Sequence, residues 1–287
     1  QEPAPALPPD AIKFAKPKAQ LYDKLFIFDD DDHSGAGTEV KSDKFRFLHI
    51  RTIVNYQLPE DSETISVNGD QIKLVQDGGK AHPAIGSFDE NSIFTEWAKG
   101  FWLRTNSKRR NEILDIVYAI PKDAKGPFAL VIDQYKTIRV ELPKQVSEPP
   151  HPASMVDVEV KTIAWGESVP GDTIRVGKDE IETTFSVPGR RLLAVSILVH
   201  AKEYNTSDGK LLNWSGRALA LRDKEGNLHV CHGGFFANRI SQNQGHHSEV
   251  GKKSTDAQTF FFSPPDEIES FDVLWYGRPV TTYEIKK

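Results

Sequence analysis

The acidic stretch near residue 30 has the residue types and spacing of half a calcium-binding loop. Asp30, Asp32 and Ser34 place oxygen-bearing side chains at alternate positions, and the glycine that follows permits a sharp turn. The twelfth position, however, is Lys41 instead of a glutamate that could bind the ion with both oxygens. Glu39 is near enough in sequence to replace it in a loop of different shape. We therefore expect either weak calcium binding by Asp30, Asp32 and Ser34 or a solvated acidic turn.

A second group of candidate metal ligands lies at His229, Cys231 and His232, with the pair His246 and His247 in the loop that follows. Alternate residues of a strand share a face, so His229 and Cys231 should point the same way. A structural zinc site ordinarily takes paired ligands from two hairpins, and only one such pair occurs here. Cys231 is also the only cysteine, which excludes an intramolecular disulfide. The pattern favours a buried thiol over a zinc site.

Aromatic and basic side chains concentrate between residues 92 and 110, a segment whose pattern is compatible with a short helix or an ordered loop. Trp97, Phe101, Trp102 and Arg109 combine flat apolar rings with a guanidinium group, as interface hot spots do. The same rings could instead close one end of a hydrophobic core. We predict that Trp97, Phe101, Trp102 and Arg109 contact a partner, either a protein or a glycan, whose identity the sequence does not give.

No familiar catalytic motif occurs in the chain. It has no G-x-S-x-G turn, no H-E-x-x-H pair, no Walker loop and no glycine fingerprint for a dinucleotide. An active site can still be assembled from residues that are distant in sequence. The sequence therefore favours a protein that is not an enzyme, with a hydrolase lacking a recognisable motif as the less favoured alternative.

Composition describes a mildly acidic chain, with a formal net charge of -5 and 27% charged residues. It lacks the basic excess of a nucleic-acid-binding protein, so we expect no nucleic-acid partner. No apolar run reaches the roughly 18 residues of a membrane span. The opening QEPAPALPPD is proline-rich and typical of a flexible spacer. We expect it to follow a removed signal peptide or lipid anchor, which predicts an exported protein that is periplasmic, on the cell surface or extracellular.

The elements that must position these residues occur twice. Placing Pro121 on Pro264 aligns the segment 115–142 with a segment ending at residue 285 without a gap, at a spacing of 143 residues (264 minus 121). In both copies a Pro-containing turn precedes a strand with alternating apolar residues, and a second such strand follows. The aligned apolar residues of the first strand are Phe128, Leu130 and Ile132 in one copy and Phe271, Val273 and Trp275 in the other.

Other runs with β-branched and aromatic residues are strand-like, and turn signals separate them. They cover residues 21–28, 45–54, 71–75, 156–165, 183–187 and 192–199. The run 192–199 repeats 47–54, and Leu219 and Leu221 repeat Ile72 and Leu74. Prolines at positions 143, 149, 150 and 152 predict an extended connection between the copies. We therefore predict a spacer over residues 1–19, a sandwich over 20–142, a linker over 143–154 and a second sandwich over 155–287.

The second half contains, in order, the strands VEVKTIAW and LLAVSILVHAKEY, the hairpin ALALRDKEGNLHV and the closing FFFSPPDEIESFDVLWYG. This order resembles the immunoglobulin-like domains of unknown function in secreted bacterial proteins. The resemblance covers residues 155–287 well and 20–142 more loosely. It implies an all-β chain of two tandem immunoglobulin-like antiparallel β-sandwiches, related by internal duplication and without a catalytic motif. The predicted function is that of an exported binding or adhesion-type protein, with a carbohydrate-binding module as the alternative.

Overall fold

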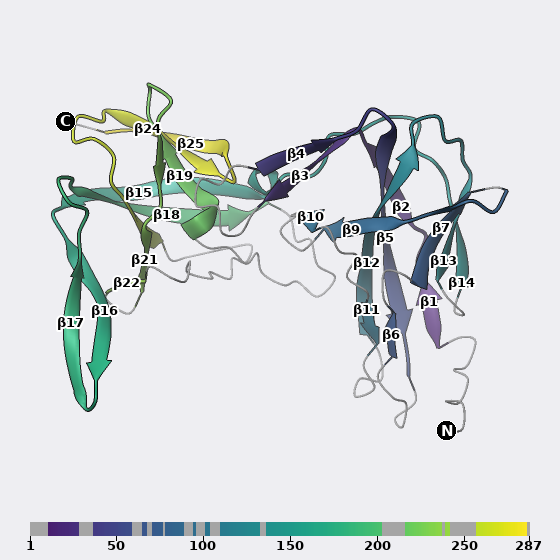
Figure 1. Cartoon of the computed structure of the whole chain (residues 1–287), viewed down its shortest axis with the longest axis horizontal. Helices are drawn as coiled ribbons and strands as arrows, with labels where there is room; N and C mark the ends of the chain where they lie inside the picture. Colours follow the sequence, from purple (N-terminus) through teal and green to yellow (C-terminus); the bar gives the residue numbers. More distant parts are fainter. Residues whose placement is uncertain are drawn as a thin grey trace.

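The part of the chain that the computed structural model describes forms β-sheets whose strand pairs are antiparallel, except for one parallel pair (Figure 1). The described residues are 11–28, 37–58, 65–67, 71–76, 78–88, 94–95, 101–103, 110–132, 136–202, 216–236, 239–241 and 257–285. They contain two short 3-10 segments, η2 (Pro152–Met155) and η3 (Gly216–Ala218). No helix in these ranges is long and apolar enough to span a membrane. The all-β prediction is confirmed.

Two main sheets form in residues 12–140. The larger has the order β1-β5-β12-β9-β10-β3-β4, with β2 also paired to β5. Its strands are β1 (Ile12–Phe14), β2 (Lys18–Tyr22), β3 (Lys24–Phe28), β4 (Gly37–Lys41), β5 (Phe45–Tyr56), β9 (Ala84–Phe88), β10 (Phe94–Thr95) and β12 (Arg110–Pro121). The smaller has the order β14-β13-β7-β8 and comprises β7 (Ile72–Gln76), β8 (Ala81–His82), β13 (Phe128–Ile132) and β14 (Lys136–Val140). A separate pair joins β6 (Ile65–Val67) to β11 (Phe101–Leu103).

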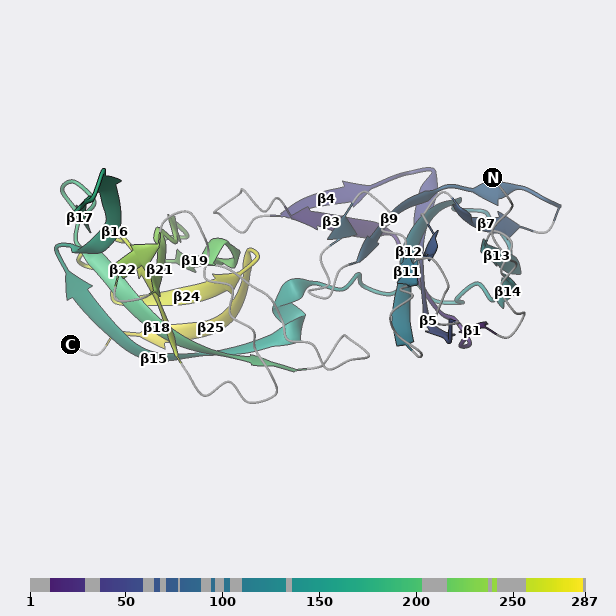
Figure 2. The same cartoon turned by 90° about the horizontal axis from the view of Figure 1, so that it is seen from below.

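Residues 156–284 form three further sheets. A five-stranded sheet of order β15-β18-β23-β21-β22 comprises β15 (Val156–Gly166), β18 (Leu192–Ala201), β21 (Gly233–Phe236), β22 (Arg239–Ser241) and β23 (Gln258–Phe262). A four-stranded sheet of order β20-β19-β24-β25 comprises β19 (Leu219–Arg222), β20 (Leu228–Val230), β24 (Ser270–Trp275) and β25 (Arg278–Glu284). The third is a two-stranded hairpin of β16 (Val169–Val176) and β17 (Asp179–Phe185). Figure 2 shows the five-stranded and the four-stranded sheet curving around the same interior.

Each half has a hydrophobic core between its two main sheets. In the first half, Leu48 and Ile50 of β5 face Leu74 and Leu130 of the smaller sheet. Leu48 and Ile50 share their buried face with Val54. The second core includes the fully buried side chains Phe260, Phe262, Phe271, Val273 and Trp275. Because complete burial of one such side chain stabilises the fold by about 1.5–3 kcal/mol, these faces fix which way each strand points.

The closing hairpin of the second copy confirms the predicted alternation of apolar residues. Phe271 and Val273 point into the core, and their strand β24 pairs with β25. Tyr276 and Gly277 connect the two strands, with φ values of 47° and 77°. Positive φ at both central residues is typical of the type I′ turn, which matches the twist of the flanking strands. The register shifts by one residue between Val273 and Leu274, so a β-bulge joins the pairing at the buried face to the pairing at the turn.

The structure differs from the sequence prediction around residues 92–110. The helix or ordered loop expected there is replaced, in the described part, by two short strands, β10 and β11. The backbone of Phe101 to Leu103 pairs with that of Ile65 to Val67. Pairing with a strand that is distant in sequence has overridden the local pattern.

The large sheet also takes in residues that the sequence assigns to a spacer. Ile12 stands opposite Tyr56, and Lys18 opposite Arg51, so that β1 and β2 both pair with β5. The described part of residues 1–19 therefore belongs to the sheet. The pairing is explained by burial of Ile12, whose side chain is part of the first core. The sequence prediction missed β1 and the start of β2 because Pro17 interrupts the apolar pattern between them.

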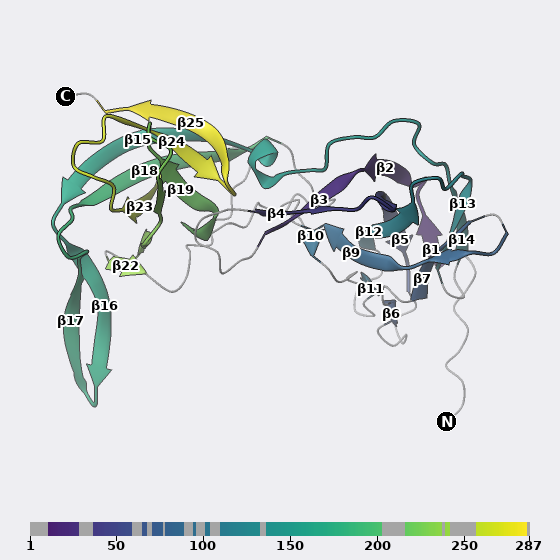
Figure 3. The same ribbon diagram turned by 45° about the horizontal axis from the view of Figure 1, so that its top comes forward.

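Contacts near the predicted linker join β3, the linker and β25. The ring of Phe26 lies edge-on to His151, with 5.8 Å between ring centroids. The guanidinium of Arg278 lies 5.2 Å from the centre of the same ring, and so does the ammonium of Lys24. In the described ranges, each pair of strands lies within 12–140 or within 156–284 (Figure 3), and one isolated bridge joins Leu21 to Val146 of the linker. The domain boundary itself stays a prediction.

Candidate functional site

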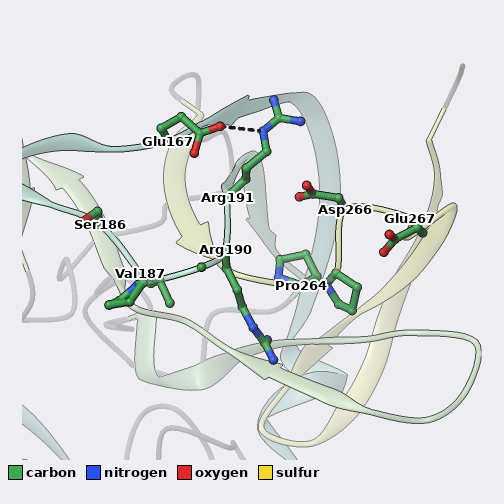
Figure 4. Close-up of a pocket in the computed structure, with 11 residues that line it drawn as sticks. Glu167, Ser186, Val187, Arg190, Arg191, Pro264, Asp266 and Glu267 are labelled. Carbon is green, nitrogen blue, oxygen red and sulfur yellow. Dashed lines mark ion pairs between the residues drawn. The ribbon is translucent and has the colours of Figure 1, made fainter.

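A cleft lies at one end of the sheets formed by residues 156–284, where three connections meet (Figure 4). Its volume is about 680 Å³. The β15–β16 connection contributes Glu167, the β17–β18 connection contributes residues 186–191, and the turn between β23 and β24 contributes residues 264–267. Loops carried by rigid sheets are common positions for binding residues, because the sheets hold the loop ends in place.

Arg190 is anchored at the base of this cleft. Its Nη1 donates a hydrogen bond of 3.0 Å to the carbonyl oxygen of Ser263. The hydroxyl of the same serine lies 2.8 Å from Nε2 of His232. Burial, together with the positive charge of Arg190, lowers the pKa of His232 from its ordinary value. His232 therefore stays neutral near pH 7, and Arg190 carries the positive charge here.

Arg191, the next residue, is held by a different pair of contacts. Its Nε lies 3.4 Å from Oε1 of Glu167, and its guanidinium lies 5.3 Å from the centre of the Trp165 ring. In Figure 4 the side chains of Arg190 and Arg191 leave the backbone in opposite directions. Two guanidinium groups therefore border the cleft, Arg190 hydrogen-bonded to the backbone of Ser263 and Arg191 in an exposed ion pair with Glu167.

The opposite wall is acidic. Asp266 and Glu267 are exposed on the turn after β23, and their carboxylates are visible at the rim in Figure 4. With Glu167, they set three carboxylates against the two guanidinium groups. The charges are nearly balanced, so the cleft does not select strongly for anions or cations. It offers hydrogen-bond donors on one side and acceptors on the other.

A second, smaller cavity of about 380 Å³ adjoins the cleft and shares Pro265 and Glu267 with it. Its floor includes Asp223, which accepts hydrogen bonds from the backbone and side-chain nitrogens of Asn227 at 2.7 and 2.9 Å. Nε2 of His229 lies 3.0 Å from the same carboxylate. Burial alone would raise the pKa of Asp223, but the hydrogen bonds from Asn227 and His229 outweigh it and lower the pKa. Asp223 therefore fixes the β19–β20 turn in an ionised state.

The composition of the cleft fits binding better than catalysis. Among the residues that line it, Ser186 carries the only nucleophilic hydroxyl, and none is a histidine or a cysteine. Serine needs an adjacent general base to act as a nucleophile. The lining also contains no aromatic ring on which a sugar could stack.

In the first half of the chain, Tyr22, His49 and Asp115 are joined by hydrogen bonds between their side chains. The Tyr22 hydroxyl lies 3.0 Å from Nδ1 of His49, and Nε2 of His49 lies 2.9 Å from Asp115 Oδ1. The backbone N–H of Phe88 donates to the same oxygen at 3.2 Å. Tyr22 has no solvent exposure and His49 only 6%, and burial followed by the charge of Asp115 raises the pKa of Tyr22. These hydrogen bonds link β2, β5, β9 and β12 across the larger sheet.

The residues that the sequence singled out for binding fall mostly beyond what the structure describes. Trp97 and Arg109 lie outside the described residues, as do Asp30, Asp32 and Ser34 of the acidic turn. Phe101 and Trp102 are in β11, of which only the backbone pairing with β6 is described. The interface and calcium hypotheses therefore both stay predictions.

Glu39, the carboxylate considered as a substitute calcium ligand, lies in β4. One of its oxygens is 3.3 Å from Nζ of Lys24. An ammonium group at that distance competes with a cation for the carboxylate. If the acidic turn binds calcium, Glu39 must first give up this partner.

The cysteine and histidine group is described in part. Cys231 is buried, and its burial raises the pKa of the thiol to about 12, which agrees with an unreactive thiol. His229 points to the same buried side, while Val230 between them and Leu228 before them are exposed. His246 and His247 lie outside the described residues. Within the described ranges, no group of three or more His, Cys, Asp or Glu side chains could hold a metal ion.

Comparison with known proteins gave no match to a family model, to a curated protein or to a solved structure. The resemblance to immunoglobulin-like domains thus stays a prediction from the order of the strands.

Sequence reasoning did not find the cleft. Its parts lie at residues 167, 186–191 and 264–267, and nothing in the sequence shows that these loops meet. One signal was available: adjacent arginines in a Pro-Gly-Arg-Arg turn, followed about 75 residues later by the acidic turn Pro-Pro-Asp-Glu. Both turns flank strands of the predicted sandwich, and strands that pair bring their flanking turns together.

Proposed function

We propose that the chain is an exported, non-enzymatic binding protein of the adhesion type, and that the cleft bordered by Arg190, Arg191, Asp266 and Glu267 receives an exposed segment of a protein partner. The observation that carries the proposal is the fixed arrangement of the two arginines. Arg190 is tied to the backbone of Ser263, and the Arg191 guanidinium lies over an aromatic ring. Such preorganisation reduces the entropy that binding must offset.

The chemistry of the cleft favours a protein over a glycan. Guanidinium donors and carboxylate acceptors of nearly balanced charge complement a peptide segment, which itself offers both N–H and C=O groups. Arginine is also enriched among the residues that dominate protein interfaces. A sugar-binding site would usually add an aromatic platform, and the lining has none. The carbohydrate-binding alternative therefore rests on the tryptophans of residues 92–110.

We further propose that the two halves are immunoglobulin-like sandwiches related by duplication. The repeated strand orders support this: β8-β7-β13-β14 in the first half corresponds to β20-β19-β24-β25 in the second. The registers agree as well, since Phe128 pairs with Val140 and, 143 residues later, Phe271 pairs with Tyr283. On this basis Asp123 in the first copy is the counterpart of Asp266.

The counterpart supplies a matched control for the test of function. Asp266→Lys with Glu267→Lys reverses the acidic wall, whereas Asp123→Lys reverses the same position in the other copy. Candidate partners are isolated from the exported fraction of the source organism with the wild-type protein, and the affinity of each purified partner is then measured by biolayer interferometry. We expect the double variant to bind at least tenfold more weakly, about 1.4 kcal/mol, and Asp123→Lys to bind as the wild type does.

Two outcomes would contradict the proposal. If the double variant keeps full affinity at an unchanged melting temperature, the partner binds elsewhere. If a glycan array shows sugar binding that the same double variant abolishes, the cleft belongs to a carbohydrate-binding module. The proposal that its partner is a protein would then be wrong.

A further inference from the structure

The hairpin of β16 and β17 extends away from the sheets that precede and follow it (Figures 1 and 3). Gly177 begins its two-residue turn with a φ of 65°, a conformation that glycine adopts without strain. The two strands form a sheet of their own. β22 packs beside the base of β16, where Thr173 is half-buried. Residues 174–182 toward the tip are exposed, and in the described part of the chain their strands pair only with each other. Toward the tip, the outer edges therefore present backbone N–H and C=O groups that a further strand could bind.

One face of this hairpin is apolar and exposed. Ile174 stands directly opposite Ile181, and Val176 lies on the same face because it is two residues further along β16. Their exposed fractions are 55%, 52% and 56%. Single exposed apolar residues are ordinary on a protein surface, but three neighbours on a projecting element mark an interaction surface.

The other face is charged, and its two strands differ in sign. Arg175 of β16 lies 3.1 Å from Glu180 of β17, and both side chains are mostly exposed. Glu182, also on β17, stands opposite Thr173. Towards the tip, β16 thus presents a positive charge on this face and β17 presents negative charges.

We propose that this hairpin pairs edge to edge with the same hairpin of a second copy of the chain, with β17 of one copy binding β16 of the other in antiparallel orientation. Charge selects this pairing, because β17 against β17 would bring glutamates together. In antiparallel pairing, the register that places Arg175 of the second copy opposite Glu182 also places Val176 of the second copy opposite Ile181. The charged faces and the apolar faces therefore match in one register.

The contact uses two different edges, so it is heterologous. Each copy keeps one free edge after the first contact, and association continues into a ring or an open chain. An array of this kind would display many copies of the cleft and raise the avidity for a repeated partner. The self-pairing does not depend on the cleft having that function.

Charge exchange tests the pairing. Glu182→Lys sets lysine against Arg175 of the next copy, and Arg175→Glu sets glutamate against Glu182. Each variant alone should stay monomeric in sedimentation velocity, at the 32.2 kDa of one chain, from micromolar to millimolar concentration. The wild type should increase in average mass over the same range. An equimolar mixture of the two variants restores opposite charges at every contact and should associate as the wild type does.

Glu159→Lys, on the exposed side of β15, is the control and should associate normally. A wild type that stays at the mass of one chain throughout would overturn the proposal, as would single variants that associate like the wild type or a mixture that stays monomeric. Circular dichroism checks that each variant is folded. Should one fail that check, Ile181→Ser replaces it, and normal association of this variant would equally overturn the proposal.

Discussion

His82 and His229 occupy the same place in two hairpins, each standing opposite a buried leucine of the neighbouring strand. Both histidines are buried. Nε2 of His82 lies 3.4 Å from Oε1 of Gln76, and Nε2 of His229 lies 3.0 Å from Oδ2 of Asp223. In each case the partner is six residues earlier in the chain. The second hairpin thus carries a charged form of a contact that is neutral in the first.

The charged contact should matter more for stability. Asp223→Asn removes a carboxylate that accepts hydrogen bonds from Asn227 and His229, and turns an amide N–H₂ toward groups that donate. We expect the free energy of unfolding in urea to fall by about 1–3 kcal/mol at pH 7. At the corresponding position of the first copy, Gln76→Ala removes the 3.4 Å contact with His82 and an exposed hydrogen bond to the carbonyl oxygen of Lys125, and it should cost less. Equal losses would contradict this account.

The effect of Asp223→Asn should also depend on pH. Because the folded state lowers the pKa of Asp223, its contribution is present above the unfolded value of about 3.9 and is lost as pH falls through the folded pKa. The difference in stability between wild type and variant should therefore be large at neutral pH and shrink in acid. A difference that is the same at both ends of the range would show that the charge is not responsible.

His151 should make stability depend on pH in the range above that of Asp223. Burial and the nearby Arg278 lower its pKa from 6.5 to about 4. The folded state therefore favours the neutral ring, and stability decreases as pH falls from 6.5 to 4, because the unfolded chain binds the proton first. The contribution is on the order of 1–3 kcal/mol, allowing for solvent screening.

His151→Asn isolates this contribution. The Nδ1 atom of His151 accepts a hydrogen bond from the backbone N–H of Ala153, and an asparagine oxygen can take over that role at the start of the 3-10 turn. Urea unfolding at several pH values should show a smaller slope between pH 6.5 and 4 for the variant. His82 and His232, whose pKa values are also lowered, leave a residual slope. If the slope of stability against pH is unchanged in the variant, the pH dependence comes from His82 and His232 and not from His151.

The contacts of Phe26 should protect the predicted linker. Its ring meets His151 of the linker and Arg278 of β25. Phe26→Ala removes both contacts, so limited proteolysis should cut residues 143–154 faster than in the wild type, with the sites identified by mass spectrometry. Phe45→Ala, at an aromatic residue that is already 41% exposed, is the control. If the two variants are cut at the same rate, the Phe26 contacts do not restrain the linker.

Weak calcium binding by the acidic turn remains a proposal with a simple test. Because the twelfth position is Lys41 and Glu39 is occupied by Lys24, millimolar calcium should raise the melting temperature only slightly. Asp30→Ala with Asp32→Ala should remove that rise. No rise in the wild type would mean that the turn is only a solvated acidic loop.

Sequence periodicity predicted those strands in which buried and exposed residues alternate. Phe128 and Phe271, which the alignment of the copies placed at equivalent positions, are both buried in paired strands. Alternation of apolar residues is readable because each strand has one face in the core. It failed at Phe101–Leu103, where pairing with a distant strand decides the conformation.

The candidate site was not readable in the same way. Arg190 and Glu167 belong to loops, which carry no periodic signal, and their meeting depends on how β15, β18 and β23 are ordered in the sheet. The hydrogen bond of Arg190 to the backbone of Ser263 leaves no trace in residue types at all. Asp223 and His229 were visible as a turn and a strand residue, but their burial was not.

Site-specific photo-cross-linking tests the central claim, that the cleft of the second copy binds a protein partner, most directly. Benzoylphenylalanine is placed at Asp266 in one sample and at its counterpart Asp123 in another, and both are irradiated with the isolated partner. The account predicts a covalent adduct from position 266, mapped by mass spectrometry to one segment of the partner, and none from position 123. Equal adducts from both positions, or an adduct from 123 alone, would contradict it.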